Sequence, residues 1–142
     1  SFWGQPPAVP EPYAFVLMPF EERRTEIYER YVKQPIERDL KLKTRRADDI
    51  MASTNVMDDV WQYILSASVV VADMTGGNAN VFYELGLSHA AGIPVVLITE
   101  RIEDVPFDLR QVRTIVYGSS PSGWERLANQ VIQYVQKAMR ET

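Results

Sequence analysis

The residues best suited to chemistry lie in a short segment that follows an apolar, β-branched run. Asp73 ends that run, and a pair of glycines follows it, where a backbone without Cβ atoms can approach a ligand closely. Asn78 or Asn80 can cap the helix that begins next, which places Glu84 in its first or second turn. Because a helix N-terminus stabilises a nearby negative charge, we expect Glu84 to be an anion.

The carboxylates Asp73 and Glu84 suit chemistry at a sugar carbon. An anionic carboxylate beside a ligand-sized gap can act as a nucleophile, or it can stabilise an oxocarbenium ion. The same residues also fit a structural role, in which Asp73 caps a loop and Glu84 only balances the helix dipole. The residues alone leave both interpretations open.

Other polar side chains have weaker links to a site. Arg46, at the end of a basic run, can pair with a phosphate or lie at a solvated strand end. If the substrate were a nucleoside, Asp73, Asp48 or Asp49 could protonate the leaving base. Tyr83 can either line a pocket or face a neighbouring helix. His89 lies five residues after Glu84, about 140° away around the helix, so we do not expect the two to share a site.

Composition excludes several classes of protein. The chain has 142 residues, with 15 Lys and Arg against 19 Asp and Glu, and its net charge of −4 argues against general nucleic-acid binding. It has no Cys and one His, which excludes disulfides, thiolate catalysis and Cys-based or multi-His metal sites. No apolar run reaches the roughly 20 residues that a membrane span needs. We expect one globular domain without a metal, in the cytoplasm.

Strand and helix patterns alternate along the chain after a proline-rich start. Residues 1–12 are typical of an arm or linker, and residues 13–142 of one α/β domain. A proline at position 35 is expected to kink or restart the first helix. The predicted strands are 13–18, 40–46, 68–73, 94–99 and 114–117, and the predicted helices are 21–39, 55–67, 78–91 and 124–139.

This alternation predicts right-handed crossovers onto one parallel sheet. The expected fold is a flavodoxin-like three-layer sandwich, with a five-stranded parallel sheet in the order 2-1-3-4-5. Ligands of such sheets bind beyond the carboxyl ends of the strands, at the switch between strands 1 and 3. Pro19, Asp48, Asp73 and Glu100 follow or end predicted strands, so we expect the chemistry near them.

Four stretches of the sequence resemble motifs of one superfamily and occur in the same order along the chain. They are VVVADMTGGNANVFYELGLSHAAGIPVVLIT at 69–99, FVLMPF at 15–20, RADDI at 46–50 and VPFDLRQVRTIVY at 105–117. Together they resemble the nucleoside 2-deoxyribosyltransferase-like superfamily, and especially its bacterial Toll/interleukin-receptor (TIR)-like relatives. The likeness spans residues 15–117, nearly the whole predicted domain.

The resemblance implies roles for individual residues. Glu84 of the ELG turn matches the carboxylate that attacks or faces the anomeric carbon of a ribose. Asp73 matches a position that helps to hold the sugar or base, and Met18, Pro19 and Phe20 match a loop that lines the ligand pocket. Beside these we expect three further substrate contacts: Asn80, Asp48 and Arg46.

The resemblance also implies an activity, namely cleavage of an N-glycosidic bond at a ribose. The main expectation is NAD hydrolysis that releases nicotinamide, with NAD as substrate and no cofactor, by an effector domain in bacterial antiphage defence. Self-association would complete the site, and a preceding sensor module would belong to a longer protein. Two alternatives stay open, a nucleoside or nucleotide N-glycosidase or 2-deoxyribosyltransferase, and a non-catalytic nucleotide-binding or assembly module.

Overall fold

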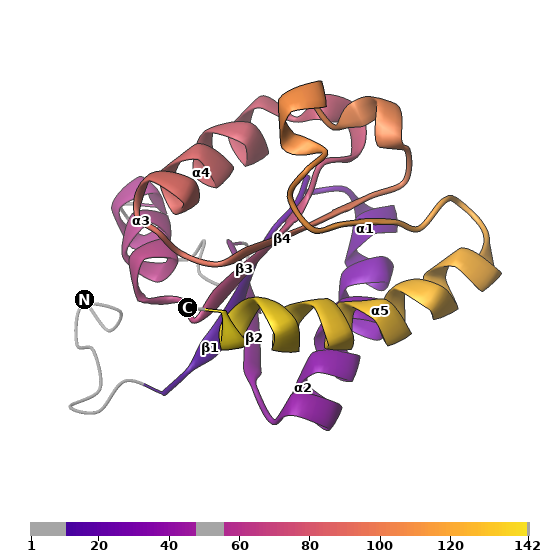
Figure 1. Ribbon diagram of the computed structural model, residues 1–142, viewed down its shortest axis with the longest axis horizontal. Coiled ribbons are helices and arrows are strands. Elements are labelled where there is room, and N and C mark those ends of the chain that lie inside the picture. The colour runs from indigo at the N-terminus through magenta and orange to yellow at the C-terminus, as the bar shows by residue number, and fades with distance from the viewer. Residues whose placement is uncertain (1–10, 48–55, 142) are drawn as a thin grey trace.

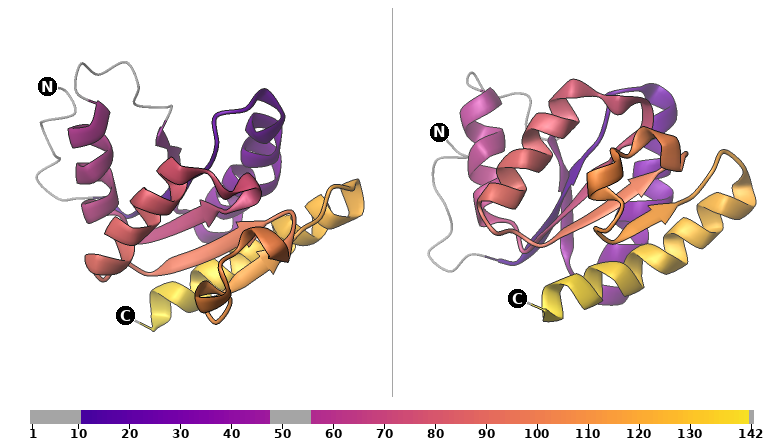
Figure 2. Two further views of the ribbon diagram at one scale, coloured as in Figure 1. Left: turned by 90° about the horizontal axis from the view of Figure 1, so that it is seen from above. Right: turned by 45° about the horizontal axis from the view of Figure 1, so that its top comes forward.

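The computed structural model describes residues 11–47 and 56–141, and it has the predicted three layers (Figures 1 and 2). Its five strands are all parallel and lie in the order 2-1-3-4-5, which confirms the flavodoxin-like fold class. The strands are β1 (Tyr13–Leu17), β2 (Lys43–Arg46), β3 (Val69–Asp73), β4 (Val95–Thr99) and β5 (Thr114–Val116). The longer helical elements are α1 (Glu22–Ile27), η1 (Tyr28–Lys33), α2 (Gln34–Leu40), α3 (Val56–Ser66), α4 (Ala79–Ala90) and α5 (Pro121–Arg140).

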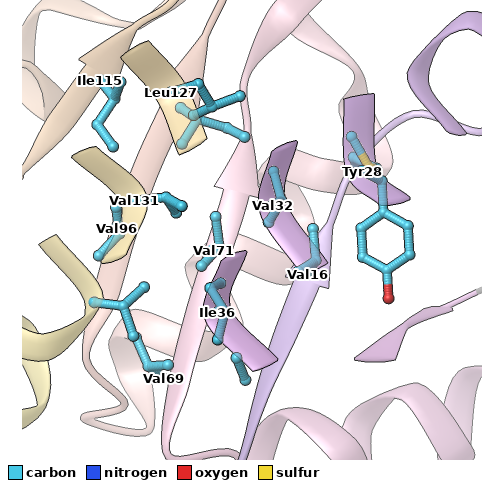
Figure 3. Close-up of a cluster of buried hydrophobic side chains, with 14 of the residues drawn as sticks. Val16, Tyr28, Val32, Ile36, Val69, Val71, Val96, Ile115, Leu127 and Val131 are labelled. Carbon is cyan, nitrogen blue, oxygen red and sulfur yellow. The ribbon is translucent and has the colours of Figure 1, made fainter. Parts of the chain in front are cut away.

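Each face of the sheet has its own apolar core. Residues 69–73 and 95–99 are buried throughout, because helices cover both faces of these central strands. Val16 and Val71 point to the face that α1, η1, α2 and α5 cover (Figure 3). Phe15 and Val70 point to the opposite face, which α3 and α4 cover. Alternate residues of one strand therefore serve different cores.

The first predicted helix is divided, as its proline suggests. A π-helical segment, η1, follows α1, and α2 begins at Gln34 with Pro35 in its first turn. The backbone N–H of Gln34 donates to the carbonyl of Glu29, five residues back, which is the bonding of a π turn. Proline fits a first helical turn because that turn does not need its missing N–H.

Some predicted boundaries are wrong. Leu40 ends α2 rather than opening a strand, because Lys41 adopts a left-handed conformation (φ 53°) that terminates the helix. The last helix begins at Pro121, three residues before the predicted start, after Ser120 in extended conformation. The predicted loop at 100–113 contains two short 3₁₀ turns, η4 (Ile102–Asp104) and η5 (Phe107–Leu109).

Two other predictions concern the ends and the surface of the fold. Residues 1–10 of the predicted arm lie outside the described residues, and Glu11 and Pro12 have no regular secondary structure. Across residues 11–47 and 56–141, no helix combines the length and the apolar character needed to cross a membrane.

Gly123 packs against the backbone after β5, and this makes α5 sensitive to one methyl group. A Cβ atom at Gly123 would lie 1.8 Å from the carbonyl oxygen of Tyr117. We expect Gly123→Ala to lower the free energy of unfolding by about 2–3 kcal/mol, because backbone must move to relieve the overlap. Denaturant unfolding measures the loss.

The matched control for this prediction is Gly86→Ala in α4. A Cβ atom at Gly86 meets nothing within 4 Å. That variant should gain up to about 1 kcal/mol, because alanine loses less conformational entropy in a helix. Equal stability of the two variants would contradict the close contact at Gly123.

Candidate active site

A pocket of about 180 Å³ lies where the segment after β1 meets the first half of α4. We refer to it as the α4 pocket. It opens at the switch between β1 and β3, the part of the sheet where the sequence predicts ligand chemistry. Its lining comes from four segments of the chain: Met18, Pro19, Phe20, Ala47, Val60, Asn78, Asn80, Val81, Tyr83 and Glu84.

The α4 pocket has an apolar floor and an aromatic rim. Met18, Val60 and Val81 are buried and supply much of the floor. Phe20 and Tyr83 are exposed and line the opening. An apolar floor lowers the local dielectric constant, which strengthens electrostatic interactions beside it.

Asn78 fixes the start of the helix that carries the polar lining. Its backbone is extended, and its side-chain Oδ1 accepts hydrogen bonds from the backbone N–H of Asn80 (2.9 Å) and of Val81 (3.1 Å). Asn78, and not Asn80, is therefore the N-cap. The side chain of Asn80 is left to face the pocket.

Glu84 lies in the second turn of α4, six residues after the cap. Burial raises the pKa of Glu84 to about 7. The expectation that the helix N-terminus holds it as an anion is wrong in direction, because that field fades within the first turn and desolvation dominates. Within the described part of the chain, the carboxyl group has no hydrogen-bond or ion-pair partner, and it lines the pocket.

Asn80 and Glu84 form a pair one helical turn apart. Residues four apart lie on the same face of a helix, and both of these line the α4 pocket. An amide beside a carboxyl group offers donors and acceptors to neighbouring hydroxyl groups. The arrangement can therefore bind a sugar and keep a carboxylate next to it.

Asp73 does not line the α4 pocket. Its carboxyl group is fully buried on the opposite face of the sheet, where Tyr117 donates to Oδ2 (2.7 Å). The hydroxyl (2.6 Å) and backbone N–H (3.0 Å) of Thr75 donate to Oδ1. Arg24 donates to the Tyr117 hydroxyl (2.9 Å) and also pairs with Glu100. We refer to these five residues as the buried network.

The hydrogen-bond donors around Asp73 indicate whether its carboxyl group is ionised. Burial raises the pKa of Asp73, while the hydrogen bonds from Thr75 and Tyr117 and the charge of Arg24 oppose that rise. Three donors point at a group that can only accept when ionised. This donor set fits a carboxylate whose charge is balanced by Arg24.

The buried network also shapes the turn before α4. Thr75 accepts from the backbone N–H of Glu100 (3.0 Å), and the N–H of Gly76 donates to Asp104 (2.9 Å). Gly76 has a φ of 77°, which a residue without a Cβ adopts readily. Sequence reasoning missed Arg24 and Tyr117, because they come from distant segments and no spacing relates them to Asp73. It also missed Thr75, although this residue lies only two positions after Asp73 and its hydroxyl is a local donor.

The remaining predicted contacts are divided among several places. Arg46 is buried behind Met18, 3.5 Å from its sulfur, with its guanidinium 4.7 Å from the ring centre of Tyr28, so it does not line the α4 pocket. Asp48 lies outside the described residues. Tyr83 lines the pocket, whereas His89 is exposed in the last turn of α4.

The structure thus brings five of the predicted contacts together, namely Met18, Pro19, Phe20, Asn80 and Glu84. In the part of the chain that the structure describes, no cluster of His, Asp and Glu is able to hold a metal ion. A scan against models of protein families found no match, and a search of curated proteins found no significant match.

Proposed function

We propose that the protein cleaves an N-glycosidic bond at a ribose, with NAD as the substrate and nicotinamide as the leaving group. The observation that carries the proposal is the half-buried carboxyl group of Glu84 inside the α4 pocket, one turn from Asn80 and without a partner among the described residues. The resemblance of the sequence to NAD-cleaving TIR-like domains supports the same chemistry.

Glu84 acts in its ionised form in this reaction. The bond between ribose C1′ and the nicotinamide nitrogen breaks, its electron pair goes to nicotinamide, and positive charge develops on the sugar. A carboxylate beside C1′ stabilises that charge. Water then adds to C1′ and loses a proton, so the products are nicotinamide, ADP-ribose and a proton. Nicotinamide leaves as a neutral base, so no acid is needed.

The wider biological role rests on the resemblance alone. We place the domain among cytoplasmic effectors of bacterial antiphage defence that deplete NAD. Self-association on activation and a preceding sensor module are parts of the same proposal. For this reason the assays below use concentrated protein.

A nucleoside is the second candidate substrate, and two features of the pocket favour it. A pKa of about 7 leaves much of Glu84 protonated at neutral pH, and a protonated carboxyl can donate to a leaving base. Among the described residues, no Lys or Arg lines the α4 pocket to hold phosphates. This reading covers nucleoside N-glycosidases and 2-deoxyribosyltransferases.

The test is base release from NAD and from a nucleoside panel between about pH 5 and about pH 9. For NAD, kcat/KM should rise about tenfold per pH unit and level off above about pH 7, as Glu84 ionises. A rate that falls as the pH rises through 7 would instead identify the acid role and a nucleoside. Release of no base from any compound would contradict both.

A further inference from the structure

We propose that Phe20 and Tyr83 bind a flat nucleobase-type ring between them at the opening of the α4 pocket. This inference rests on the proposed function, because it names the part of the ligand that the rim of the same pocket recognises. Neither the composition nor the sequence resemblance assigns a role to Tyr83.

The two side chains are exposed although both are large and aromatic. Phe20 is 55% exposed and Tyr83 is 58% exposed, and both line the α4 pocket. They come from separate parts of the chain, the segment after β1 and the second turn of α4. Single exposed aromatic residues are common on protein surfaces, but two on one pocket form an apolar surface that a ligand can cover.

Their backbones are held in place before a ligand arrives. Phe20 follows Met18 and Pro19, which are buried, and a turn after them is closed by the N–H of Glu21 and the carbonyl of Pro19 (3.1 Å). Tyr83 lies within a capped helix, next to Glu84. A ligand that stacks on these two rings does not have to order the backbone around them, so the entropic cost of binding is small.

A flat heterocycle fits this rim better than a phosphate or an aliphatic group. Aromatic side chains stack on the face of any nucleobase, and Tyr83 adds a hydroxyl that can bond a ring nitrogen. No Lys or Arg of the described residues lines the pocket, so the rim offers no charge to a phosphate. A ring at the rim would leave the attached ribose beside Asn80 and Glu84.

Phe107 provides a matched control on the same protein. It is 78% exposed, more than either rim residue, but it does not line the α4 pocket. The guanidinium of Arg110 lies 6.0 Å from the centre of its ring. Phe107→Ala therefore removes exposed aromatic surface from the protein and leaves the lining of the α4 pocket unchanged.

The experiment titrates the intact chain with adenine and, separately, with nicotinamide, and follows binding by NMR. We expect Phe20→Ala and Tyr83→Ala each to weaken the affinity for at least one ring by about fivefold or more. Phe107→Ala should stay within about twofold of the wild type. Tyr83→Phe keeps the ring and loses only the hydroxyl, so it should weaken binding less than Tyr83→Ala does. The more strongly affected ring is the one that the rim holds.

Two results would overturn the proposal. One is the absence of saturable binding of either ring to the wild type. The other is an unchanged affinity in both alanine variants. Neither probe contains a glycosidic bond, so the outcome is independent of hydrolysis. Binding that depends on the rim, without base release from any substrate, would leave this inference standing and overturn the proposed reaction alone.

Discussion

We expect Glu84→Gln to lower base release by about 10³-fold while making the folded protein more stable above neutral pH. Glutamine has nearly the same shape, but it cannot ionise, so it cannot stabilise the positive charge that develops on the ribose. Chromatography of free base after incubation of concentrated protein with NAD measures the loss of activity.

The gain in stability follows from the sign of the pKa shift. Folding raises the pKa of Glu84 from its ordinary 4.5 to about 7. Below about pH 4.5 the carboxyl is protonated in both states, and its burial costs little. Between about pH 4.5 and about pH 7 the unfolded chain releases a proton that the folded protein keeps, so wild-type stability falls across that range and levels off above it. Glutamine avoids this cost, which we place at about 1–2 kcal/mol after allowing for partial exposure.

A variant that loses activity but gains stability has lost a catalytic group, because damage to the fold would lower both activity and stability. Thermal unfolding at about pH 8 should give the variant a midpoint a few degrees higher, and the difference should disappear near about pH 4.5. Glu125→Gln, at an exposed position of α5, should change neither property. Full base release by Glu84→Gln would contradict the catalytic role of Glu84. No base release from either protein, with nucleotide binding unchanged in the variant, would support the non-catalytic binding module instead.

Asp73→Ala should cost about 3–5 kcal/mol of stability, the largest loss that we expect from a single substitution here. The change leaves the buried guanidinium of Arg24 without the nearby Asp73 charge that favours it, and it leaves two hydroxyl donors, Thr75 and Tyr117, without their acceptor. Buried polar groups that lose a partner retain the full penalty of desolvation.

Denaturant unfolding of Asp73→Ala and of Asp108→Ala measures this effect against an exposed carboxylate. The control should stay within about 0.5 kcal/mol of the wild type. If Asp73→Ala were as stable as the wild type but lost its affinity for substrate, the role implied by the resemblance would be right. The buried network would then be less important than its geometry indicates.

Local sequence patterns determined the elements and their order. Continuous apolar runs predict strands covered on both faces, and three- and four-residue spacings predict the helices between them. Parallel strands bring their carboxyl ends to one edge, so residues after β1 and β3 meet there. This rule alone is enough to predict that Met18, Phe20, Asn80 and Glu84 lie near one another, as they do.

Tertiary structure decided which way the side chains face. Asp73 shares the orientation of Val69 and Val71, because alternate residues of a strand point to the same side. That side is covered by α1 and α5, away from the α4 pocket. A strand that is apolar throughout carries no alternation to mark its two faces, so its sequence does not show which helix each side chain meets.

The electrostatics of Glu84 were likewise decided by packing. Its sequence position near a helix start predicts a stabilised anion. In the structure, Glu84 lines a pocket with the apolar side chains of Met18, Val60 and Val81. Burial there raises its pKa. These neighbours come from three separate segments. A pKa depends on the surroundings of a group in space, and only the folded chain brings those surroundings together.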